Sequence, residues 1–356
     1  MMRDYVKEKV LARGKRISIG IDVHKESWQV TAISEGEELF HGRMPGDYSA
    51  LRKLLNRFAD CQIRVAYEAG CCGFGLYDRL RADGIEALVV PPSLIPVESG
   101  NKVKTDRRDS RKLARLLEGN LLKRVHVPTE QERAYRELLR TRRQLVNHRS
   151  DVERQIKSKL LFYSIRSPLP LKQQWTGPYL EWLKRLQWGD TYLKVCFDIL
   201  VRLCEDLTSK VKELNQRIKE LAATETYKER VGLLKTVPGI GSLTAMEILT
   251  ELQEMSRFGS AEQLASYLGL TPSEYSSGDR VRQGRITRCG NKRVRSCLVE
   301  SSWFLIAKDP KMREKYLRIK YRRGAKRAII AIARNLSGRI RRMLLNHEPY
   351  VVQAAA

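Results

Sequence analysis

Two short apolar runs near the start of the chain end in a carboxylate, and this feature restricts the possible folds most. Asp22 closes the first run in Ile-Gly-Ile-Asp-Val-His, and Glu68 closes a later one in Val-Ala-Tyr-Glu-Ala-Gly. The runs expected as β-strands are residues 17–23, 28–33, 38–43, 63–67 and 87–90, with helices expected at 49–58, 76–82 and 105–117. A charged group at the end of a strand that otherwise needs burial must be solvated, paired or bound to metal. The sequence therefore predicts an α/β domain over residues 16–127 with acidic groups at a sheet edge.

Two further acids follow in Lys-Thr-Asp-Arg-Arg-Asp, where Asp106 and Asp109 are three residues apart. On a helix this spacing directs both side chains the same way. Four carboxylates that converge can hold one or two Mg²⁺ ions and promote phosphoryl transfer. Each acid alone has an ordinary explanation, as a turn former or as a partner of a neighbouring arginine. The order of strand Asp, strand Glu and helical Asp pair matches ribonuclease-H-like nucleases, whose mixed sheet begins with three antiparallel strands.

His24 stands two residues after Asp22 and either acts in this site or packs beside it. The residues leave that choice open.

The net charge indicates a polyanionic partner. Lys and Arg number 67 against 41 Asp and Glu, which gives a formal net charge of +26. Nucleic acid is the expected partner because basic side chains release counterions from phosphates, although a merely basic surface is the alternative. The 7 cysteines are scattered, which argues against a disulfide framework or a zinc site. No membrane span or signal peptide is recognisable, so a cytoplasmic location is expected, and the purpose of the basic leader before the first strand stays open.

The middle of the chain, residues 128–226, is predicted to consist of long helices. Thr129 and Glu132 form a potential capping box that begins the first of them. In the second, apolar residues alternate spacings of four and three, the pattern of a coiled coil. These positions are Leu193, Phe197, Leu200, Cys204, Leu207, Val211, Leu214, Ile218 and Leu221. Pairing within one chain and pairing between chains both satisfy the pattern.

Residues 227–350 are expected to form a mostly helical domain that contacts nucleic acid. Gly239 and Gly241 in Val-Pro-Gly-Ile-Gly resemble a helix-hairpin-helix turn, where backbone N–H groups approach a phosphate, although a purely structural corner is the alternative. A dense basic stretch follows at 311–342, with Tyr316 and Tyr321 available to stack on unpaired bases. Its expected contact residues are Lys320, Arg322, Arg323, Lys326 and Arg327.

A polar loop of this region combines serine with arginine. Ser276 and Ser277 precede Gly278, and the surrounding phosphate-binding candidates are Arg280, Arg282, Arg285 and Arg288. Guanidinium groups can stabilise a serine oxygen that attacks a phosphodiester. On the residues alone, however, a loop serine is more often a turn former.

These motifs together resemble the DEDD transposases of the insertion-sequence one-ten family. Gly-Ile-Asp22-Val-His-Lys, Tyr-Glu68-Ala-Gly, Lys-Thr-Asp106-Arg-Arg-Asp109, Val-Pro-Gly-Ile-Gly241, Gly-Leu-Thr-Pro272 and Ser277-Gly278 occur in the family's order. The resemblance implies a RuvC-like domain whose four acids bind Mg²⁺, a coiled coil, and a C-terminal transposase domain in which Ser277 is the nucleophile that holds DNA as a phosphoserine. Ser276 is a neighbouring alternative.

The resemblance also implies partners and a setting. A bridge RNA would pair with donor and target DNA, and the chain would assemble from dimers into a tetramer, near the nucleoid of a bacterium. Two other functions remain open: a RuvC-like junction nuclease that hydrolyses DNA with water, and a non-enzymatic architectural protein that binds nucleic acid.

Overall fold

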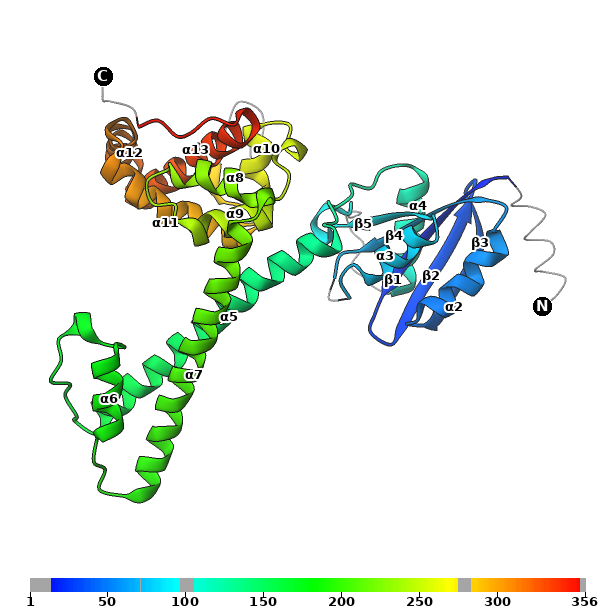
Figure 1. Cartoon of the computed structure of the whole chain (residues 1–356). Helices are drawn as coiled ribbons and strands as arrows, with labels where there is room; N and C mark the ends of the chain where they lie inside the picture. Colours follow the sequence, from blue (N-terminus) through cyan, green and yellow to red (C-terminus); the bar gives the residue numbers. More distant parts are fainter. Residues whose placement is uncertain (1–13, 71, 97–105, 275–282, 353–356) are drawn as a thin grey trace. The chain divides into compact units, whose positions relative to one another are not determined.

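The computed structural model describes residues 14–70, 72–96, 106–274 and 283–352, without the side chains of Asp106, Arg107 and Gln283. The chain divides into two compact units, Met1–Pro128 and Thr129–Ala356. Figure 1 shows the elements of each unit. The predicted segments 128–226 and 227–350 fall, apart from Pro128, in the second unit. None of the helices in the described ranges is long and apolar enough to cross a membrane.

The first unit is built on a five-stranded mixed sheet in the order β3-β2-β1-β4-β5. Strands β1, β2 and β3 are antiparallel neighbours, whereas β1, β4 and β5 run parallel. All five predicted strands are confirmed, as is the opening of the sheet with three antiparallel strands. Their bounds are β1 Arg16–Val23, β2 Ser27–Ser34, β3 Glu37–Pro45, β4 Gln62–Glu68 and β5 Glu86–Val90.

Helices cover both faces of this sheet. One face carries Ile17, Ile19 and Ile21. It is covered by α2 (Tyr48–Leu55), the short 3-10 turn η1 (Asn56–Phe58) and α3 (Gly75–Ala82). Helix α4 (Asp106–Glu118) packs on the opposite face, where Leu117 contacts Ala66 and Val90. The predicted helices at 49–58, 76–82 and 105–117 are therefore confirmed.

Two long helices dominate the first part of the second unit. Helix α5 (Glu130–Phe162) begins at the predicted capping box, in which Thr129 Oγ1 accepts from Glu132 N at 3.2 Å and Thr129 N donates to the Glu132 carboxylate at 2.8 Å. Helix α7 (Thr191–Ala222) packs beside α5 within the chain (Figure 1). Between them lie η3 (Leu171–Gln173), α6 (Gly177–Arg185) and a small aromatic core.

The predicted apolar seam of α7 is largely buried. Phe197, Cys204, Leu207, Val211 and Ile218 are buried, while Leu193, Leu200, Leu214 and Leu221 are half-buried. At least part of the seam is therefore covered by α5 of the same chain. Supercoiling of the two helices, and pairing with another chain, stay predictions.

The remaining helices share one large core. They are α8 (Glu225–Lys235), α9 (Ser242–Leu252), α10 (Ala261–Tyr267), α11 (Lys292–Lys308), α12 (Pro310–Arg323) and α13 (Ala325–Asn346), with the short turn η4 (Met255–Arg257). The sequence suggested only a loop between α10 and α11, but β6 (Pro272–Glu274) and β7 (Gln283–Ile286) pair there as antiparallel strands. Strands of three and four residues are too short to show an alternating pattern.

Candidate carboxylate and nucleic-acid sites

Asp22 and Glu68 end two neighbouring parallel strands. The β1–β4 register pairs Gly20 with Ala66 and Ile21 with Tyr67, which puts the two acids at the next paired position. Side chains alternate along a strand, so both acids project to the face of Gly20 and Ala66, which α4 covers. The Asp22 side chain is only 16% exposed. The convergence expected for these two carboxylates is consistent with this register.

Gly20 allows α4 to lie directly on the sheet beside these acids. A Cβ at Gly20 would stand 2.2 Å from Ser110 O and 2.4 Å from Ala114 N, distances that no side chain tolerates. The α4 backbone therefore occupies the space of the missing side chain. Asp109, half-buried, immediately precedes Ser110, so this close approach carries the first turn of α4 toward the carboxyl ends of β1 and β4.

His24 contacts the site directly. Its Nε2 lies 3.2 Å from Asp22 Oδ2, and its backbone oxygen accepts a hydrogen bond of 3.1 Å from the buried Trp28 indole. The Trp28 contact fixes the turn after β1, and the imidazole, 53% exposed, lies against the carboxylate from the solvent side. His24 is therefore placed to orient Asp22.

Metal binding at this edge is consistent with the donor chemistry. Asp22, Glu68 and Asp109 offer carboxylate oxygens, the ligands that Mg²⁺ prefers. Within the described residues no three His, Cys, Asp or Glu side chains are gathered closely enough to form a metal site. The Asp106 side chain is outside the description, so the four-acid set stays a prediction.

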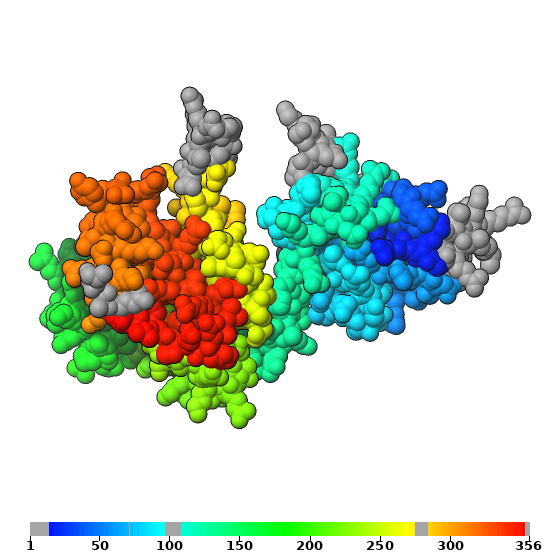
Figure 2. All heavy atoms as spheres, turned by 90° about the horizontal axis from the view of Figure 1, so that it is seen from above, coloured from blue at the N-terminus to red at the C-terminus, as the bar shows by residue number. Residues whose placement is uncertain are grey.

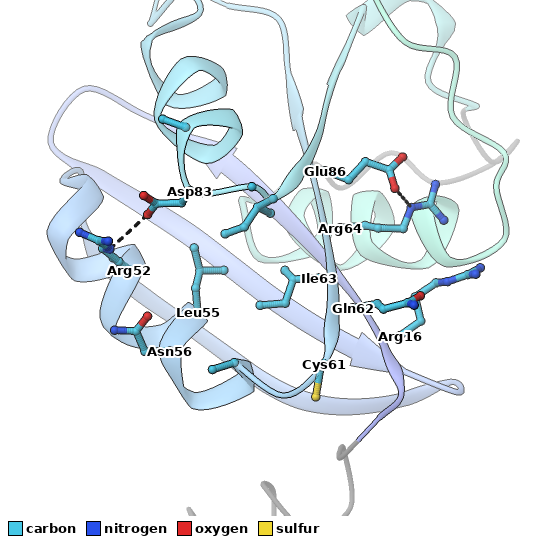
Figure 3. A pocket seen from close by; sticks show the side chains of 14 residues that line it. Arg16, Arg52, Leu55, Asn56, Cys61, Gln62, Ile63, Arg64, Asp83 and Glu86 are labelled. Atoms are coloured by element: carbon cyan, nitrogen blue, oxygen red, sulfur yellow. Dashed lines mark ion pairs between the residues drawn. The ribbon is translucent and has the colours of Figure 1, made fainter.

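A separate hollow lies at the other end of the same strands (Figure 3). It is lined by the amino ends of β1, β4 and β5 and by α2, and no sequence motif predicted it. Arg52 pairs with Asp83 at 3.1 Å and Arg64 with Glu86 at 3.3 Å. Acids of the hollow therefore already pair with these two guanidinium groups.

The helix-hairpin-helix-like turn joins α8 to α9. Gly239 has a positive φ of +88° and packs on α11, where a Cβ would meet the Phe304 Cβ at 2.6 Å. Ser301 Oγ donates to Gly239 O at 3.1 Å. Gly241 precedes the first turn of α9 and has open space where a Cβ would stand. The structure thus gives Gly239 a packing role and leaves the start of α9 accessible at Gly241.

The predicted serine and arginine loop is described only at its stems. Ser276, Ser277, Arg280 and Arg282 lie outside the described residues. Arg285, on β7, and Arg288, just after it, are exposed.

The basic candidates at the junction of α12 and α13 are all exposed. This junction turns at Gly324, and the helices are orange to red in Figure 2. Lys320, Arg322, Arg323, Lys326 and Arg327 lie here, and the Tyr321 ring is 94% exposed. Tyr316, by contrast, is 7% exposed and meets Trp303 edge-on at 5.8 Å. The expectation that Tyr316 stacks on bases is therefore wrong, because its ring belongs to the core.

Comparison with known proteins identifies the family. The family model described as Transposase IS116/IS110/IS902 family matches residues 231–317, and the DEDD transposase model of IS110 elements matches residues 19–165. The chain is 33% identical over 291 residues to y4qE of Sinorhizobium fredii, which carries a transposase name, covering 80% of this chain and 70% of that one. The chain belongs to the IS116/IS110/IS902 transposase family. The transposase of IS1111A from Coxiella burnetii is 24% identical over 97% of this chain and 98% of its own length.

As a transposase of this family, the chain acts in cutting and rejoining the DNA of an insertion sequence. The DEDD model covers the carboxylate edge, that is Asp22, Glu68 and Asp109, and the IS116/IS110/IS902 model covers the hairpin turn, the serine loop and α11. The predicted carboxylate residues and the predicted serine-loop residues therefore fall in different matched segments.

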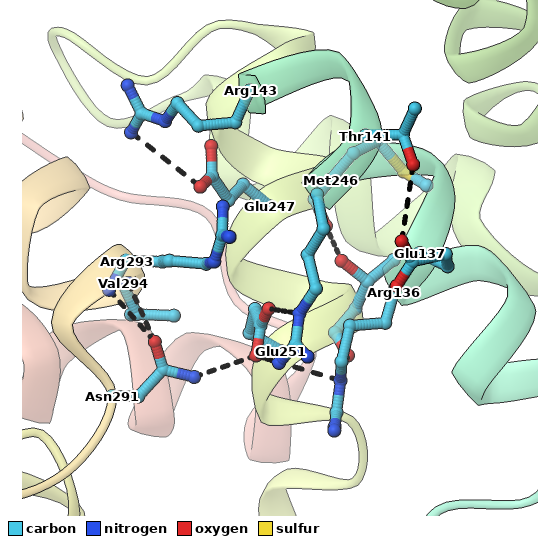
Figure 4. Close-up of polar contacts among 12 residues, drawn as sticks. Arg136, Glu137, Thr141, Arg143, Met246, Glu247, Glu251, Asn291, Arg293 and Val294 are labelled. Atoms are coloured by element: carbon cyan, nitrogen blue, oxygen red, sulfur yellow. Dashed lines mark hydrogen bonds and ion pairs between the residues drawn. The ribbon is translucent and has the colours of Figure 1, made fainter. Parts of the chain in front are cut away.

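Sequence reasoning missed a buried charge cluster in the second unit of the transposase (Figure 4). Glu251, at the end of α9 and 2% exposed, accepts from Arg140 at 2.8 and 3.1 Å and from Asn291 Nδ2 at 2.8 Å. Arg136 approaches the same carboxylate at 3.6 Å. Burial raises the pKa of Glu251, but the hydrogen bond and charge of Arg140, with the Asn291 hydrogen bond and the Arg136 charge, hold that pKa below its ordinary value.

This cluster joins three elements. Arg136 and Arg140 come from α5, Glu251 from α9, and Asn291 is the N-cap of α11, accepting from Arg293 N and Val294 N. Asn291 also lies at the end of the segment that connects β7 to α11. In the sequence Glu251 has the appearance of an ordinary polar helix position, so no local signal marks it.

Proposed function

We propose that this transposase cuts and rejoins DNA with a Mg²⁺ site at Asp22, Glu68, Asp106 and Asp109 and with Ser277 as nucleophile. A bridge RNA would select donor and target DNA, and the active form would be a homo-oligomer, a dimer that assembles into a tetramer. The observation that carries the proposal is the register of the parallel strands β1 and β4, which puts Asp22 and Glu68 directly after the paired residues Ile21 and Tyr67, on the face that α4 covers.

The carboxylate residues would bind the metal and fix its position. Bound Mg²⁺ would supply Lewis-acid stabilisation of phosphate oxygens. Asp22 and Glu68 are anchored by the ladder of a buried sheet, and His24 orients the Asp22 carboxylate. Such rigid placement suits catalysis, because preorganised groups need no rearrangement as charge develops.

The serine step is a transesterification that needs no external reductant or oxidant. The Ser277 oxygen forms a bond to a DNA phosphorus, the bond from phosphorus to one deoxyribose oxygen breaks, and the serine proton passes through a base to that oxygen. Attack by a hydroxyl of another strand on the phosphoserine rejoins DNA and restores the serine. Arg285 and Arg288, both exposed at the end of the loop, are suited to hold the phosphate.

Trapping the covalent intermediate tests the serine step. The full-length protein, with the RNA that co-purifies with it and matched DNA, should yield an adduct that survives denaturing electrophoresis. Ser277→Ala should abolish the adduct, whereas Ser276→Ala serves as the matched control and should retain it. An adduct that persists in Ser277→Ala and disappears in Ser276→Ala would reassign the nucleophile.

A junction nuclease that uses water is the second candidate. The carboxylate edge favours it, since two strand-end acids and a helical acid are sufficient for metal-assisted hydrolysis. In that case strand cleavage should survive Ser277→Ala and disappear in Asp22→Ala. Binding without any cleavage, with or without Mg²⁺, would instead support an architectural protein.

RNA guidance is proposed from the family resemblance and the basic surface. Exposed Lys326 and Arg327 at the α12–α13 junction suit contacts with an RNA backbone. Isolating the protein from cells that carry the whole insertion sequence and sequencing its bound RNA tests this. Recovery of one element-encoded RNA supports guidance, and a random cellular population contradicts it.

A further inference from the structure

A chain of polar side chains runs beneath α4 beside the carboxylate edge. Ser110 of α4 and Thr31 of β2 are both 0% exposed, and their hydroxyl oxygens lie 2.9 Å apart. Thr31 Oγ1 also lies 2.9 Å from His41 Nδ1 on β3. His41 Nε2 in turn lies 3.3 Å from Gln29 Nε2. These contacts thus connect Ser110 on the helix to Thr31, His41 and Gln29 on the strands.

The contacts define a direction for the hydrogen bonds. An amide nitrogen can only donate, so Gln29 donates to His41 Nε2, which must be the unprotonated ring nitrogen. His41 Nδ1 therefore carries the proton and donates to Thr31 Oγ1, while either hydroxyl of the Thr31–Ser110 pair can be the donor. Every link pairs a donor with an acceptor, so the buried polar groups of the network satisfy one another.

Both ends of this network adjoin the proposed metal ligands. In the β1–β2 register Gln29 pairs with Asp22, and Thr31 pairs with Gly20, the residue on which α4 rests. At the other end Ser110 follows Asp109 directly. The network therefore joins β2, the strand paired with the one that carries Asp22, to the helical turn that carries Asp109.

We infer that Thr31, His41 and Ser110 are positioning residues that fix the Asp109 turn of α4 on the sheet beside Asp22, where the proposed metal would bind. This inference rests on the proposed metal site. None of the three residues would touch the metal. They act by fixing the α4 backbone on the sheet, as outer-shell hydrogen bonds orient ligands at known metal sites.

The test measures Mn²⁺ binding to the full-length protein by calorimetry, without DNA, alongside the Mg²⁺ concentration that half-activates DNA cleavage. Thr31→Val keeps the shape and removes the hydroxyl, and it should weaken Mn²⁺ binding about tenfold or more. Thr31→Ser restores the hydroxyl and should restore the affinity. His41→Gln, on the outer strand β3, should weaken binding in the same direction.

Ser18→Ala is the matched control. Ser18 lies on β1, two positions before Gly20 and on the same face, and it is 1% exposed. Its hydroxyl has no hydrogen-bond partner among the residues described. Its removal should leave Mn²⁺ affinity unchanged, and thermal unfolding of all variants separates lost affinity from lost folding.

The outcomes separate this inference from the proposed function. Unchanged Mn²⁺ affinity in folded Thr31→Val and His41→Gln, with affinity lost in Asp22→Ala, overturns the positioning role and leaves the metal site standing. Undiminished Mn²⁺ affinity in Asp22→Ala contradicts the metal site itself. If Thr31→Val fails to fold, His41→Gln and Thr31→Ser decide the result.

Discussion

At the scale of single residues, Gly20 determines how closely α4 approaches the carboxylate edge. The nearest atoms to a Cβ at this position are backbone atoms of α4, which cannot rotate away as a side chain could. The helix must therefore move if any side chain is introduced. A glycine within an apolar strand indicates close backbone approach, so the sequence held a signal for this contact.

Gly20→Ala should destabilise the protein and disable DNA cleavage. Displacement of α4 should cost about 1–3 kcal/mol, the usual effect of overpacking a core, and should separate Asp109 from Asp22. Urea denaturation and a nicking assay measure the two effects. Gly75→Ala, where a Cβ meets open space, is the control and should change neither. Wild-type cleavage by Gly20→Ala would refute the coupling.

Glu251→Gln should destabilise the second unit strongly. The substitution leaves Arg140 and Arg136 partly buried without their shared counter-charge, and breaking such a pair costs about 3–5 kcal/mol. Glu254→Gln is the control, because that acid is 69% exposed and pairs with Arg230 at 3.2 Å, a contact worth about 0–1 kcal/mol. Equal effects of both substitutions on unfolding would contradict this account.

The Glu251 carboxylate should make the stability of the folded protein sensitive to acid. The folded-state pKa of Glu251 is lowered, so the native state holds this proton less tightly than the unfolded chain does. Its contribution is present in full above the ordinary Glu pKa and is lost as pH falls through the folded pKa. Stability measured against pH should fall in this acid range for the wild type, and Glu251→Gln should flatten that part of the curve.

At the scale of elements, the sequence predicted most of the first unit because local signals agreed there. Five apolar runs with turn residues between them became five strands. In the second unit the Thr129 capping box marks the true start of α5. The β6–β7 hairpin escaped prediction, since its strands are shorter than any periodic pattern. Glu251 escaped for another reason: its partners lie on helices more than a hundred residues away and near the α11 cap.

The acidic residues of the site could be predicted from the sequence, whereas the residues that hold them in place could not. Asp22 and Glu68 stand out as charges at the ends of apolar strands. The Thr31–His41–Ser110 network does not stand out, because these polar residues come into contact only when β2 pairs with β3 and α4 packs on the sheet.

The α5–α7 pair should depend on the buried side of the α7 seam. Phe197 is 1% exposed and packs against the Trp188 ring at 4.7 Å, so Phe197→Ala should cost about 3–5 kcal/mol. Ile199 on the same helix is 51% exposed, and Ile199→Ala should cost far less. Chemical denaturation compares the two. A large loss for Ile199→Ala would instead indicate that a second chain covers that face.

At the scale of the whole molecule, the net charge of +26 predicts salt-sensitive binding to nucleic acid. Lys326→Ala and Arg327→Ala should each reduce the slope of log affinity against log salt by about 0.9 if each residue contacts a phosphate of duplex DNA. Lys210→Ala, on α7 and paired with Asp206, is the control and should leave the slope unchanged. If Lys326→Ala and Arg327→Ala leave the slope at the wild-type value, as the control does, the α12–α13 junction is excluded from the interface.

The two proposed chemistries belong to different compact units, the carboxylates to the first and the serine loop to the second. The sequence could assign residues to each chemistry, but it could not supply the contacts that hold each unit together. Catalysis by the first unit requires that its carboxylates bind metal jointly.

Crystals of the transposase soaked in Mn²⁺ and measured for anomalous scattering test that claim most directly. We expect a Mn²⁺ peak within coordination distance of carboxylate oxygens of both Asp22 and Glu68. A fully ordered carboxylate edge that contains no such peak at saturating Mn²⁺ would contradict it.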